Sequence, residues 1–338
     1  MNTLIQQIRD KAAATSFSGV AAIHRGGKAL YREAFGDADR ANKRKNTVTT
    51  RFAIASGTKL FTALGIGALI DAGKLSLEST VRDIFQKDFS YIDSKATVAQ
   101  LLTHSSGIYD YYDEDWDIDS ENFFVDIPWY KLETPTDYLP LFAGKRPKYS
   151  PGERFSYSNG GFILLGVIIE HITGRLYRDF IRESVFAPAG MNDSGYYAFN
   201  RLPENTAYGY KKNGGTGETN IYSLPIRGAS DGGAFTTAPD LLKLWKALFG
   251  NKILSKNLTK AFLTPHITVD APVAYGCGIY ISRYSGMDMY FIVGGDAGVG
   301  FDSRYIPEKD LQINIISNIT DGEETIRDVL YGGLQAIL

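Results

Sequence analysis

Ser56 and Lys59 have the residue types and the spacing of a nucleophile and its base. Positions three apart share one face of a helix, so the two side chains can touch if a helix begins here. Burial and the positive end of that helix would both disfavour the charged form of the lysine. A neutral amine beside a serine hydroxyl is a general base for a nucleophile, and the pattern indicates this chemistry. The alternative is a lysine whose ammonium group reaches solvent from the start of a helix.

A second pair, Tyr157 and Asn159, stands in the stretch FSYSNGGF. Residues two apart point to the same side of an extended segment, so the tyrosine oxygen and the asparagine amide would face one cleft together. The alternative is that Tyr157 packs on a neighbouring part of the protein while Asn159 caps the next helix.

The element that positions the first pair can be predicted from hydropathy. The segment from Leu60 to Ile70 is apolar except for Thr62, which predicts a buried helix that starts after Ser56 and ends near Gly73. The polar side chains before and within this segment argue against a transmembrane helix. We therefore expect a buried helix inside a globular domain.

Strand patterns lie at both ends of the chain. The first is a hairpin that turns at Gly26-Gly27, and the last is a series of three strands between residues 274 and 318. Consecutive hairpins imply an antiparallel sheet. Helical patterns at the N-terminus and from Glu323 to Leu338 would flank it. The sequence thus predicts an α+β fold with a five-stranded antiparallel sheet, terminal helices and a helix-rich middle.

The composition excludes several classes of function. The 338 residues carry a net charge of −2, so no nucleic-acid partner is expected. The one cysteine, Cys277, lies in an alternating strand pattern, and the four histidines lack zinc spacing, so we expect no metal and no cofactor. The N-terminus has no signal-peptide pattern, which predicts a cytoplasmic protein or a trimmed exported form. The oligomeric state stays open.

The two pairs together resemble a known superfamily. S-x-x-K followed by Y-x-N about a hundred residues later is similar to the serine β-lactamases and penicillin-binding proteins. The stretches FAIASGTKLFTA, LLTHSSGIYDY, YSPGERFSYSNGGFILLG, GGAFTTAPDLLKL and YGCGIYI resemble its class C β-lactamase branch, with DD-peptidase, D-aminopeptidase and esterase relatives. The resemblance extends from about Ser18 to Asn318, nearly the whole chain.

The resemblance implies a β-lactamase/transpeptidase-like fold and roles for the site residues. Ser56 would be the acylated nucleophile, Lys59 its proton partner and Tyr157 a second base, while Asn159 would hold Lys59 and a substrate amide. Residues 1–63 and 221–338 would form a lobe with the sheet, and residues 64–220 a mainly helical lobe. The active site would lie between the two lobes.

The third motif of the superfamily, K-T-G or H-x-G on the strand that lines the cleft, is absent. Alignment on Gly300-Phe301 puts Gly294 where the cation should stand, followed by Gly295 and Asp296. Ala297 would then supply the second oxyanion N–H. Asp296 would repel a substrate carboxylate, unless its side chain caps the following turn.

An acidic and aromatic stretch after LLTHSSG adds a second hint about the substrate. Relatives bring this stretch to the rim of the cleft, where negative charge would attract cationic substrates. The alternative, which the charge run favours, is a solvated loop. Its acids are Asp110, Asp113, Glu114, Asp115, Asp117, Asp119, Glu121 and Asp126, mixed with Tyr109, Tyr111, Tyr112 and Trp116.

The sequence therefore predicts a serine hydrolase that acts through an acyl-enzyme on an ester, amide or peptide bond of a small molecule or peptide, with weak activity on β-lactams. One alternative is a penicillin-binding or sensing module without efficient turnover. Another is an α/β-hydrolase, because GASDG offers Ser230 as a nucleophile elbow with His266 downstream. His104 is interpreted as a structural hydrogen-bonding residue.

Overall fold

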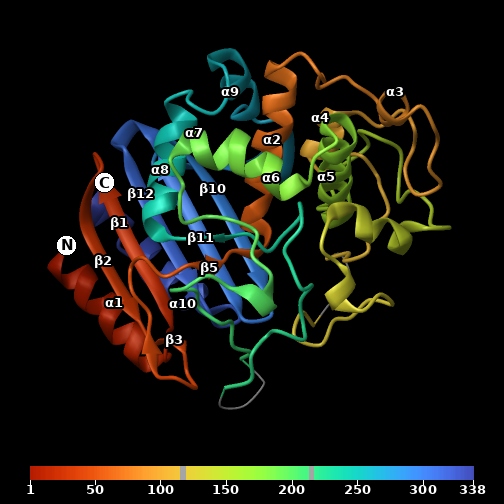
Figure 1. The fold of residues 1–338 in the computed structure, drawn as a ribbon. Helices are drawn as coiled ribbons and strands as arrows, with labels where there is room; N and C mark the ends of the chain where they lie inside the picture. The colour runs from red at the N-terminus through yellow and green to blue at the C-terminus, as the bar shows by residue number, and fades with distance from the viewer. Residues whose placement is uncertain (115–118, 213–216) are drawn as a thin grey trace.

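The computed structural model describes residues 1–114, 119–212 and 217–338. Its centre is an antiparallel sheet of eight strands in the order β2-β1-β12-β11-β10-β9-β8-β7 (Figure 1). The strands are β1 Gly19–Arg25, β2 Lys28–Phe35, β7 Ile267–Asp270, β8 Val273–Tyr275, β9 Tyr280–Tyr284, β10 Met287–Asp296, β11 Val299–Ile306 and β12 Leu311–Ser317. Two small pairs lie outside this sheet, β3 Asp37–Asp39 with β4 Arg44–Lys45 and β5 Phe52–Ala53 with β6 Phe235–Thr236.

The α+β class is confirmed, but the sheet has eight strands and not five. The pattern over residues 302–318 is two strands, because a 3-10 turn at Pro307–Lys309 and a left-handed Asp310 (φ 43°) separate β11 from β12. The pattern over residues 275–284 also breaks, because Gly278 adopts a φ of 72° between β8 and β9. These interruptions and the short strand β7 account for the three extra strands.

Helices cover both faces of the sheet (Figure 1). The N-terminal helix α1 and the C-terminal helix α10 pack together on one face, whereas α2 and α8 belong to the apolar cluster on the other. Successive residues of a strand point to opposite faces of the sheet. Ala21 therefore packs in the cluster with α1 and α10, and Val20 packs in the cluster with α2 and α8. The helices are α1 Asn2–Ala14, α2 Lys59–Asp71, α3 Val81–Phe85, α4 Val98–Leu102, α5 Asn159–Thr173, α6 Tyr177–Ile181, α7 Ala187–Ala189, α8 Ala238–Phe249, α9 Lys256–Phe262 and α10 Gly322–Gly332.

The predicted hairpin and the predicted buried helix are both confirmed. Strands β1 and β2 pair through a turn in which Gly26 and Gly27 have φ values of 56° and 74°. Such a two-residue turn needs positive φ at both positions, which glycine adopts at little cost. Every residue of α2 from Lys59 to Gly67 is buried.

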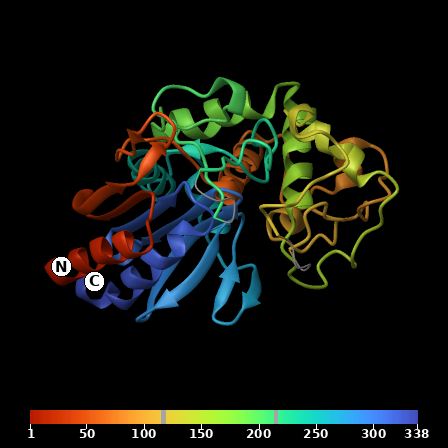
Figure 2. The ribbon, with the colours of Figure 1, turned by 90° about the horizontal axis from the view of Figure 1, so that it is seen from below.

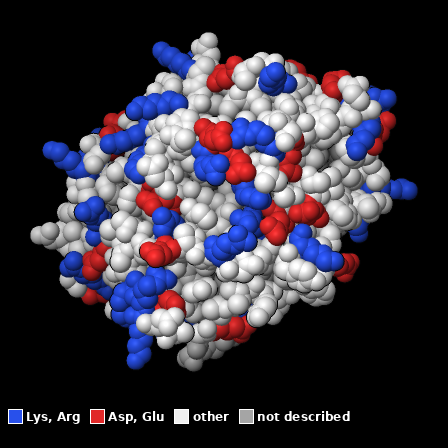
Figure 3. All heavy atoms as spheres, in the orientation of Figure 1, with Lys and Arg blue, Asp and Glu red and all other residues white. Residues whose placement is uncertain are grey.

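Helix α5 lies beside the sheet (Figure 2), with α4 and α6 packed against it, whereas α7 packs against α8. The lobe boundaries near residues 64 and 221 stay a prediction. Within the described ranges, no single helix has the length and apolarity to cross a membrane; only α5 together with Tyr177–Ala189, bent by 83°, passes that test as a pair. Basic and acidic side chains are interspersed over the face in Figure 3.

Candidate active site

Ser56 lies in a 3-10 turn, η1 (Ala55–Thr58), which runs directly into helix α2. The residue before it, Ala55, has a φ of 42°. Side chains other than glycine rarely adopt this left-handed backbone, which costs about 1 to 3 kcal/mol. The turn is held from outside, because the Gly233 N–H donates to the Ala55 carbonyl over 3.2 Å. The partly exposed Ser56 thus stands on a strained and supported turn.

Lys59 is 2% exposed, and its Nζ lies close to three oxygen atoms. The distances are 3.0 Å to Ser56 Oγ, 2.7 Å to Asn159 Oδ1 and 2.7 Å to the Asp231 carbonyl oxygen. The last two oxygens can only accept hydrogen bonds, so they take two N–H groups from the amine. A neutral Lys59 then keeps its lone pair for the Ser56 hydroxyl proton. This is the arrangement that a general base requires.

Burial lowers the pKa of Lys59. The carboxylates of Asp231, Glu114, Asp110 and Asp296 act in the opposite direction, in this order of size. Burial disfavours the charged form of an amine because the low-dielectric interior solvates it poorly. The direction of the shift is the one that lets a lysine accept a proton near neutral pH.

Tyr157 and Asn159 reach the same place from the segment that enters helix α5. The Lys59 Nζ lies 4.7 Å from the centre of the Tyr157 ring. Burial raises the pKa of Tyr157, and its hydrogen bond with Ser56 acts in the opposite direction. Asn159 does not cap the helix, since the cap is Ser158, whose Oγ accepts the Gly161 N–H over 3.0 Å. The structure thus brings all four predicted residues together.

Asp110 is a buried part of the site that the sequence did not reveal. Its carboxylate accepts three backbone N–H groups, from Asn159 at 2.6 Å, Gly160 at 3.1 Å and Tyr112 at 3.1 Å. It therefore fixes the first turn of α5 and, through it, the amide that holds Lys59. Burial raises the pKa of Asp110 to about 7, although the three N–H groups act in the opposite direction. No sequence signal separated it from the other acids of its stretch.

His104 packs against the ring of Tyr157 and binds the backbone of the next residue. Its Nδ1 accepts the Ser158 N–H at 3.0 Å, its Nε2 lies 3.2 Å from the Tyr275 hydroxyl, and its ring centre is 4.4 Å from that of Tyr157. Burial holds the pKa of His104 well below the usual range. A neutral imidazole that accepts a backbone N–H is structural, as the sequence indicated.

Asp231 contacts the site with both its backbone and its side chain. Its carbonyl accepts from Lys59, and its carboxylate accepts the Tyr111 hydroxyl. Asp231 was not predicted from the sequence, because the surrounding GASDG motif was interpreted only through Ser230. That serine is fully buried, its Oγ has no partner among the described residues, and no strand–helix elbow surrounds it. The α/β-hydrolase alternative is therefore wrong.

The strand that faces Ser56 is β10, and its register corrects one expectation. A Cβ at Gly294 would lie 2.2 Å from the Ile54 carbonyl oxygen and 2.8 Å from the Ser56 nitrogen. A lysine or histidine cannot stand there, because the strand packs directly on the backbone of η1. Val293 lines the cleft together with Tyr157. The side chain at the position before Gly294 therefore faces the substrate space.

Ala297 cannot supply a free N–H as expected. Its N–H already donates to Asp296 Oδ1 over 2.9 Å, and the residue is fully buried. Asp296 thus caps its own turn with one oxygen while it also lines the cleft beside Ser56. The turn-capping alternative for Asp296 is therefore confirmed, whereas repulsion of a substrate carboxylate stays a prediction. Gly295, which is exposed, lies between Asp296 and Gly294.

The acidic stretch is only partly a solvated rim. Asp113 pairs with Lys148 at 2.7 Å, and Glu121 accepts the backbone N–H of Lys212 over 2.6 Å. Both carboxylates thus bind other segments of the same chain. Three members of the stretch, Asp115, Trp116 and Asp117, lie outside the described residues. Among the described acids of the stretch, Glu114, Asp119 and Asp126 are exposed, and Glu114 lines the cavities at Ser56.

Cys277 is also placed differently from the expectation. It lies in the turn between β8 and β9 and is fully buried. Burial raises the pKa of its thiol to about 12, so it stays protonated. In the part of the chain that the structure describes, no three His, Cys, Asp or Glu side chains are arranged to hold a metal ion.

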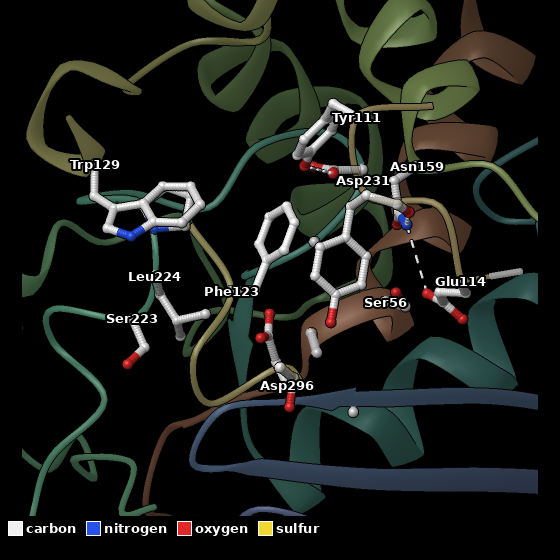
Figure 4. Close-up of a pocket in the computed structure, with 16 residues that line it drawn as sticks. Ser56, Tyr111, Glu114, Phe123, Trp129, Asn159, Ser223, Leu224, Asp231 and Asp296 are labelled. Carbon is white, nitrogen blue, oxygen red and sulfur yellow. Dashed lines mark hydrogen bonds between the residues drawn. The ribbon is translucent and has the colours of Figure 1, made fainter. Parts of the chain in front are cut away.

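Ser56 lines two cavities, the first of which is drawn in Figure 4. One, of about 520 Å³, is walled by the rings of Tyr111, Tyr112, Phe123 and Trp129. The other, of about 970 Å³, is lined by Tyr157, Tyr280, Val293 and Arg327 among others. A nucleophile between two cavities can serve a substrate that extends to both sides of the reacting bond.

Comparisons with known proteins agree with this geometry. The β-lactamase family model matches residues 3–336. Penicillin-binding protein 4* of Bacillus subtilis (strain 168) is 32% identical over 295 residues, which are 82% of this chain and 62% of that protein. The chain thus spans less than two thirds of the length of this curated relative.

Two solved structures share the fold over the whole chain. The penicillin-binding protein from Bacillus halodurans has a TM-score of 0.91 at 38% identity, covering 98% of this chain and 100% of that one. The D-amino acid amidase from Ochrobactrum anthropi SV3 has a TM-score of 0.81 at 24% identity, covering 99% of each chain. The match over residues 3–336 and the 38% identity with the Bacillus halodurans protein show that the chain belongs to the β-lactamase family.

Proposed function

We propose that the chain is a serine hydrolase that forms an acyl-enzyme on Ser56 and cleaves an ester, amide or peptide bond. The observation that carries the proposal is the buried Lys59 amine 3.0 Å from Ser56 Oγ, with its other donors taken by Asn159 and Asp231. Membership of the β-lactamase family supports it, as does the shared fold with a protein named an amidase.

The proposed acylation is a proton transfer coupled to attack. Neutral Lys59 accepts the Ser56 proton while Oγ forms a bond to the carbonyl carbon of the substrate. The bond to the leaving group then breaks, and a proton returns to that group through Tyr157, which contacts Ser56. A water molecule attacks the ester of Ser56 by the reverse proton path, which releases the acid and restores the hydroxyl.

We propose further that β-lactams are poor substrates. They carry a carboxylate beside the scissile bond, and Val293, Gly294 and Gly295 offer it no cation. Arg327 is the one basic residue among the described residues lining the larger cavity, and it is already paired with Glu323 at 3.6 Å and Glu324 at 3.4 Å. A substrate without a carboxylate at this place avoids the repulsion from Asp296.

The test is covalent labelling with a fluorophosphonate, followed by intact-mass measurement and peptide mapping. We expect one adduct on Ser56 in the wild type and in Ser230→Ala, and none in Ser56→Ala. The two serines form a matched pair, because each substitution removes one hydroxyl. An adduct on another serine, or no adduct in a folded wild type, would contradict the proposal.

A second candidate is a penicillin-binding module without efficient turnover. The loss of the third motif of the superfamily favours it, because a module that only binds its ligand does not need a complete catalytic site. Incubation with a penicillin and then with a small neutral ester separates the two. A lasting penicillin adduct together with no turnover of any ester would favour the binding module.

A further inference from the structure

Helix α2 holds the segment at Ser230 and Asp231 with two side chains that are three residues apart. Lys59 Nζ donates to the Asp231 carbonyl oxygen over 2.7 Å, and Thr62 Oγ1 donates to the Ser230 carbonyl oxygen over 2.5 Å. Residues three apart lie on the same face of a helix, so one face of α2 binds two consecutive carbonyl groups. The proposed proton transfer uses Lys59 and does not explain Thr62.

Two tyrosine hydroxyls continue the contact from Thr62 into the interior. The Tyr177 hydroxyl lies 2.6 Å from Thr62 Oγ1, and the Tyr196 hydroxyl lies 2.7 Å from that of Tyr177. All three residues are buried, and they come from α2, from α6 and from the segment that follows α7. We call these three groups the hydroxyl chain.

The direction of each hydrogen bond in the hydroxyl chain follows from its last acceptor. A carbonyl oxygen only accepts, so the proton of Thr62 points to Ser230. Each hydroxyl has one proton, so Thr62 must accept from Tyr177, and Tyr177 must accept from Tyr196. All the donors thus point toward the Ser230 carbonyl group. Hydrogen bonds that follow one another in this way polarise and strengthen each other.

The hydroxyl chain lies outside the substrate space. None of its three residues lines either cavity at Ser56, so a substrate in those cavities does not touch them. Its contact with the site is the peptide between Ser230 and Asp231. Ser230 Oγ has no hydrogen-bond partner among the described residues, so the side chain of Ser230 does not hold this peptide. The hydroxyl of Thr62 does.

We propose that the hydroxyl chain positions Lys59 for proton transfer. Thr62 fixes the peptide between Ser230 and Asp231, which holds the Asp231 carbonyl oxygen in place. That oxygen in turn orients the Lys59 amine, so that its lone pair faces Ser56. Thr62 and the two tyrosines are thus positioning residues and not catalytic ones. The inference rests on the proposed function, because it needs Lys59 to accept a proton.

The test measures fluorophosphonate labelling of Ser56 at a series of reagent concentrations. This series gives the apparent dissociation constant of the reagent and the maximal labelling rate constant. Thr62→Val keeps the shape of the side chain and removes its hydroxyl, so the Ser230 carbonyl group is released. We expect the maximal rate constant to fall about tenfold or more and the dissociation constant to stay within about twofold, because the hydroxyl chain lies outside the cavities.

Two control variants show whether the hydroxyl of Thr62 is responsible. Thr62→Ser keeps the hydroxyl group, so its maximal rate constant should stay within about threefold of the wild-type value. Thr259→Val removes another buried helix hydroxyl, which donates to the Leu254 carbonyl oxygen over 3.4 Å, and should leave both constants unchanged. A wild-type maximal rate constant in Thr62→Val, or an equal loss in either control, would overturn the proposal.

Tyr177→Phe decides the question if Thr62→Val does not fold. It keeps the ring and removes the donor that fixes the Thr62 hydroxyl, which can then turn to a carbonyl group of its own helix. We expect the maximal rate constant to fall about threefold or more, with the dissociation constant unchanged and a folded protein by circular dichroism. An unchanged maximal rate constant in folded Tyr177→Phe would then overturn the proposal.

The same measurements separate this inference from the proposed function. A folded wild type that is not labelled at Ser56 would overturn the hydrolase and, with it, the task of the hydroxyl chain. Labelling of Ser56 with equal rate constants in the wild type and in Thr62→Val would overturn the positioning role and leave the hydrolase intact.

Discussion

The two sides of the cleft at Ser56 differ in how their polar groups are satisfied. On the helix side, Lys59 has three oxygen partners and Asp110 has three N–H partners. On the strand side, Val293 and Gly294 offer no polar side chain, and Asp296 accepts one bond from its own neighbour. From this difference we propose that the helix side fixes proton transfer, whereas the strand side selects the charge of the substrate.

The largest expected effect comes from the helix side. Lys59→Met keeps the length of the side chain and removes the amine, so kcat/KM for a neutral ester should fall roughly 10²- to 10⁴-fold. The Asn159 and Asp231 oxygens lose a donor, which should also lower stability by about 1 to 3 kcal/mol. Steady-state kinetics and thermal unfolding check both effects. Ordinary activity in a folded variant would assign Lys59 to packing.

Asp110→Asn should have the next largest effect. An amide has one acceptor oxygen instead of two, so part of the three N–H bonds is lost and the first turn of α5 loosens. We expect kcat to fall about tenfold or more and the free energy of unfolding to fall by about 1 to 3 kcal/mol. Asp126→Asn is the matched control. A loss of stability with kcat unchanged would show that Asp110 stabilises the fold but does not position Asn159 for catalysis.

Val293→Lys should sharpen the contrast by adding the missing cation on the strand side. A pair of unit charges about 4 Å apart contributes about 1 to 4 kcal/mol, depending on the local dielectric. The ratio of kcat/KM for an ester with a carboxylate to that for its neutral analogue should rise about tenfold or more. Val293→Met, of similar length and uncharged, should leave the ratio unchanged. A rise in both variants would point to packing instead of charge.

The smallest effect is a pH dependence of that same ratio in the wild type. Burial raises the pKa of Asp296 to about 7, so the group is a repelling carboxylate above this pH and neutral below it. The ratio of kcat/KM for the anionic substrate to kcat/KM for its neutral analogue should therefore increase a few-fold as the pH falls through 7. Asp296→Asn should give a flat profile. A flat wild-type profile would contradict the role of Asp296.

Sequence reasoning reached the helix side because its chemistry is local. Ser56 and Lys59 are three apart where η1 runs into α2, and Tyr157 and Asn159 are two apart where an extended segment enters α5, so spacing alone predicts their faces. Fold class followed for the same reason, since hairpins and buried helices have short-range patterns. The number of strands could not be predicted in this way. The alternating sequence pattern continues across a break such as Gly278, so it looks like one strand.

The strand side could not be predicted, because it depends on register and tertiary contacts. A shift of one residue decides whether Val293 or Gly294 faces the cleft, and only the contact of Gly294 with the η1 backbone settles it. Asp110 was missed for a similar reason. Its burial comes from helix α5, which lies far along the chain, and its neighbours in sequence made it look solvated.

The central claim is that Lys59 is neutral at neutral pH and takes the proton of Ser56. The most direct measurement is the second-order rate constant for fluorophosphonate labelling of Ser56 as a function of pH, from pH 5 to pH 11. Because burial lowers the pKa of Lys59, the rate should reach its plateau below about 10.4, the ordinary pKa of lysine. A rate that climbs tenfold per pH unit up to pH 10 would contradict the account, since Lys59 would then be an ordinary charged amine.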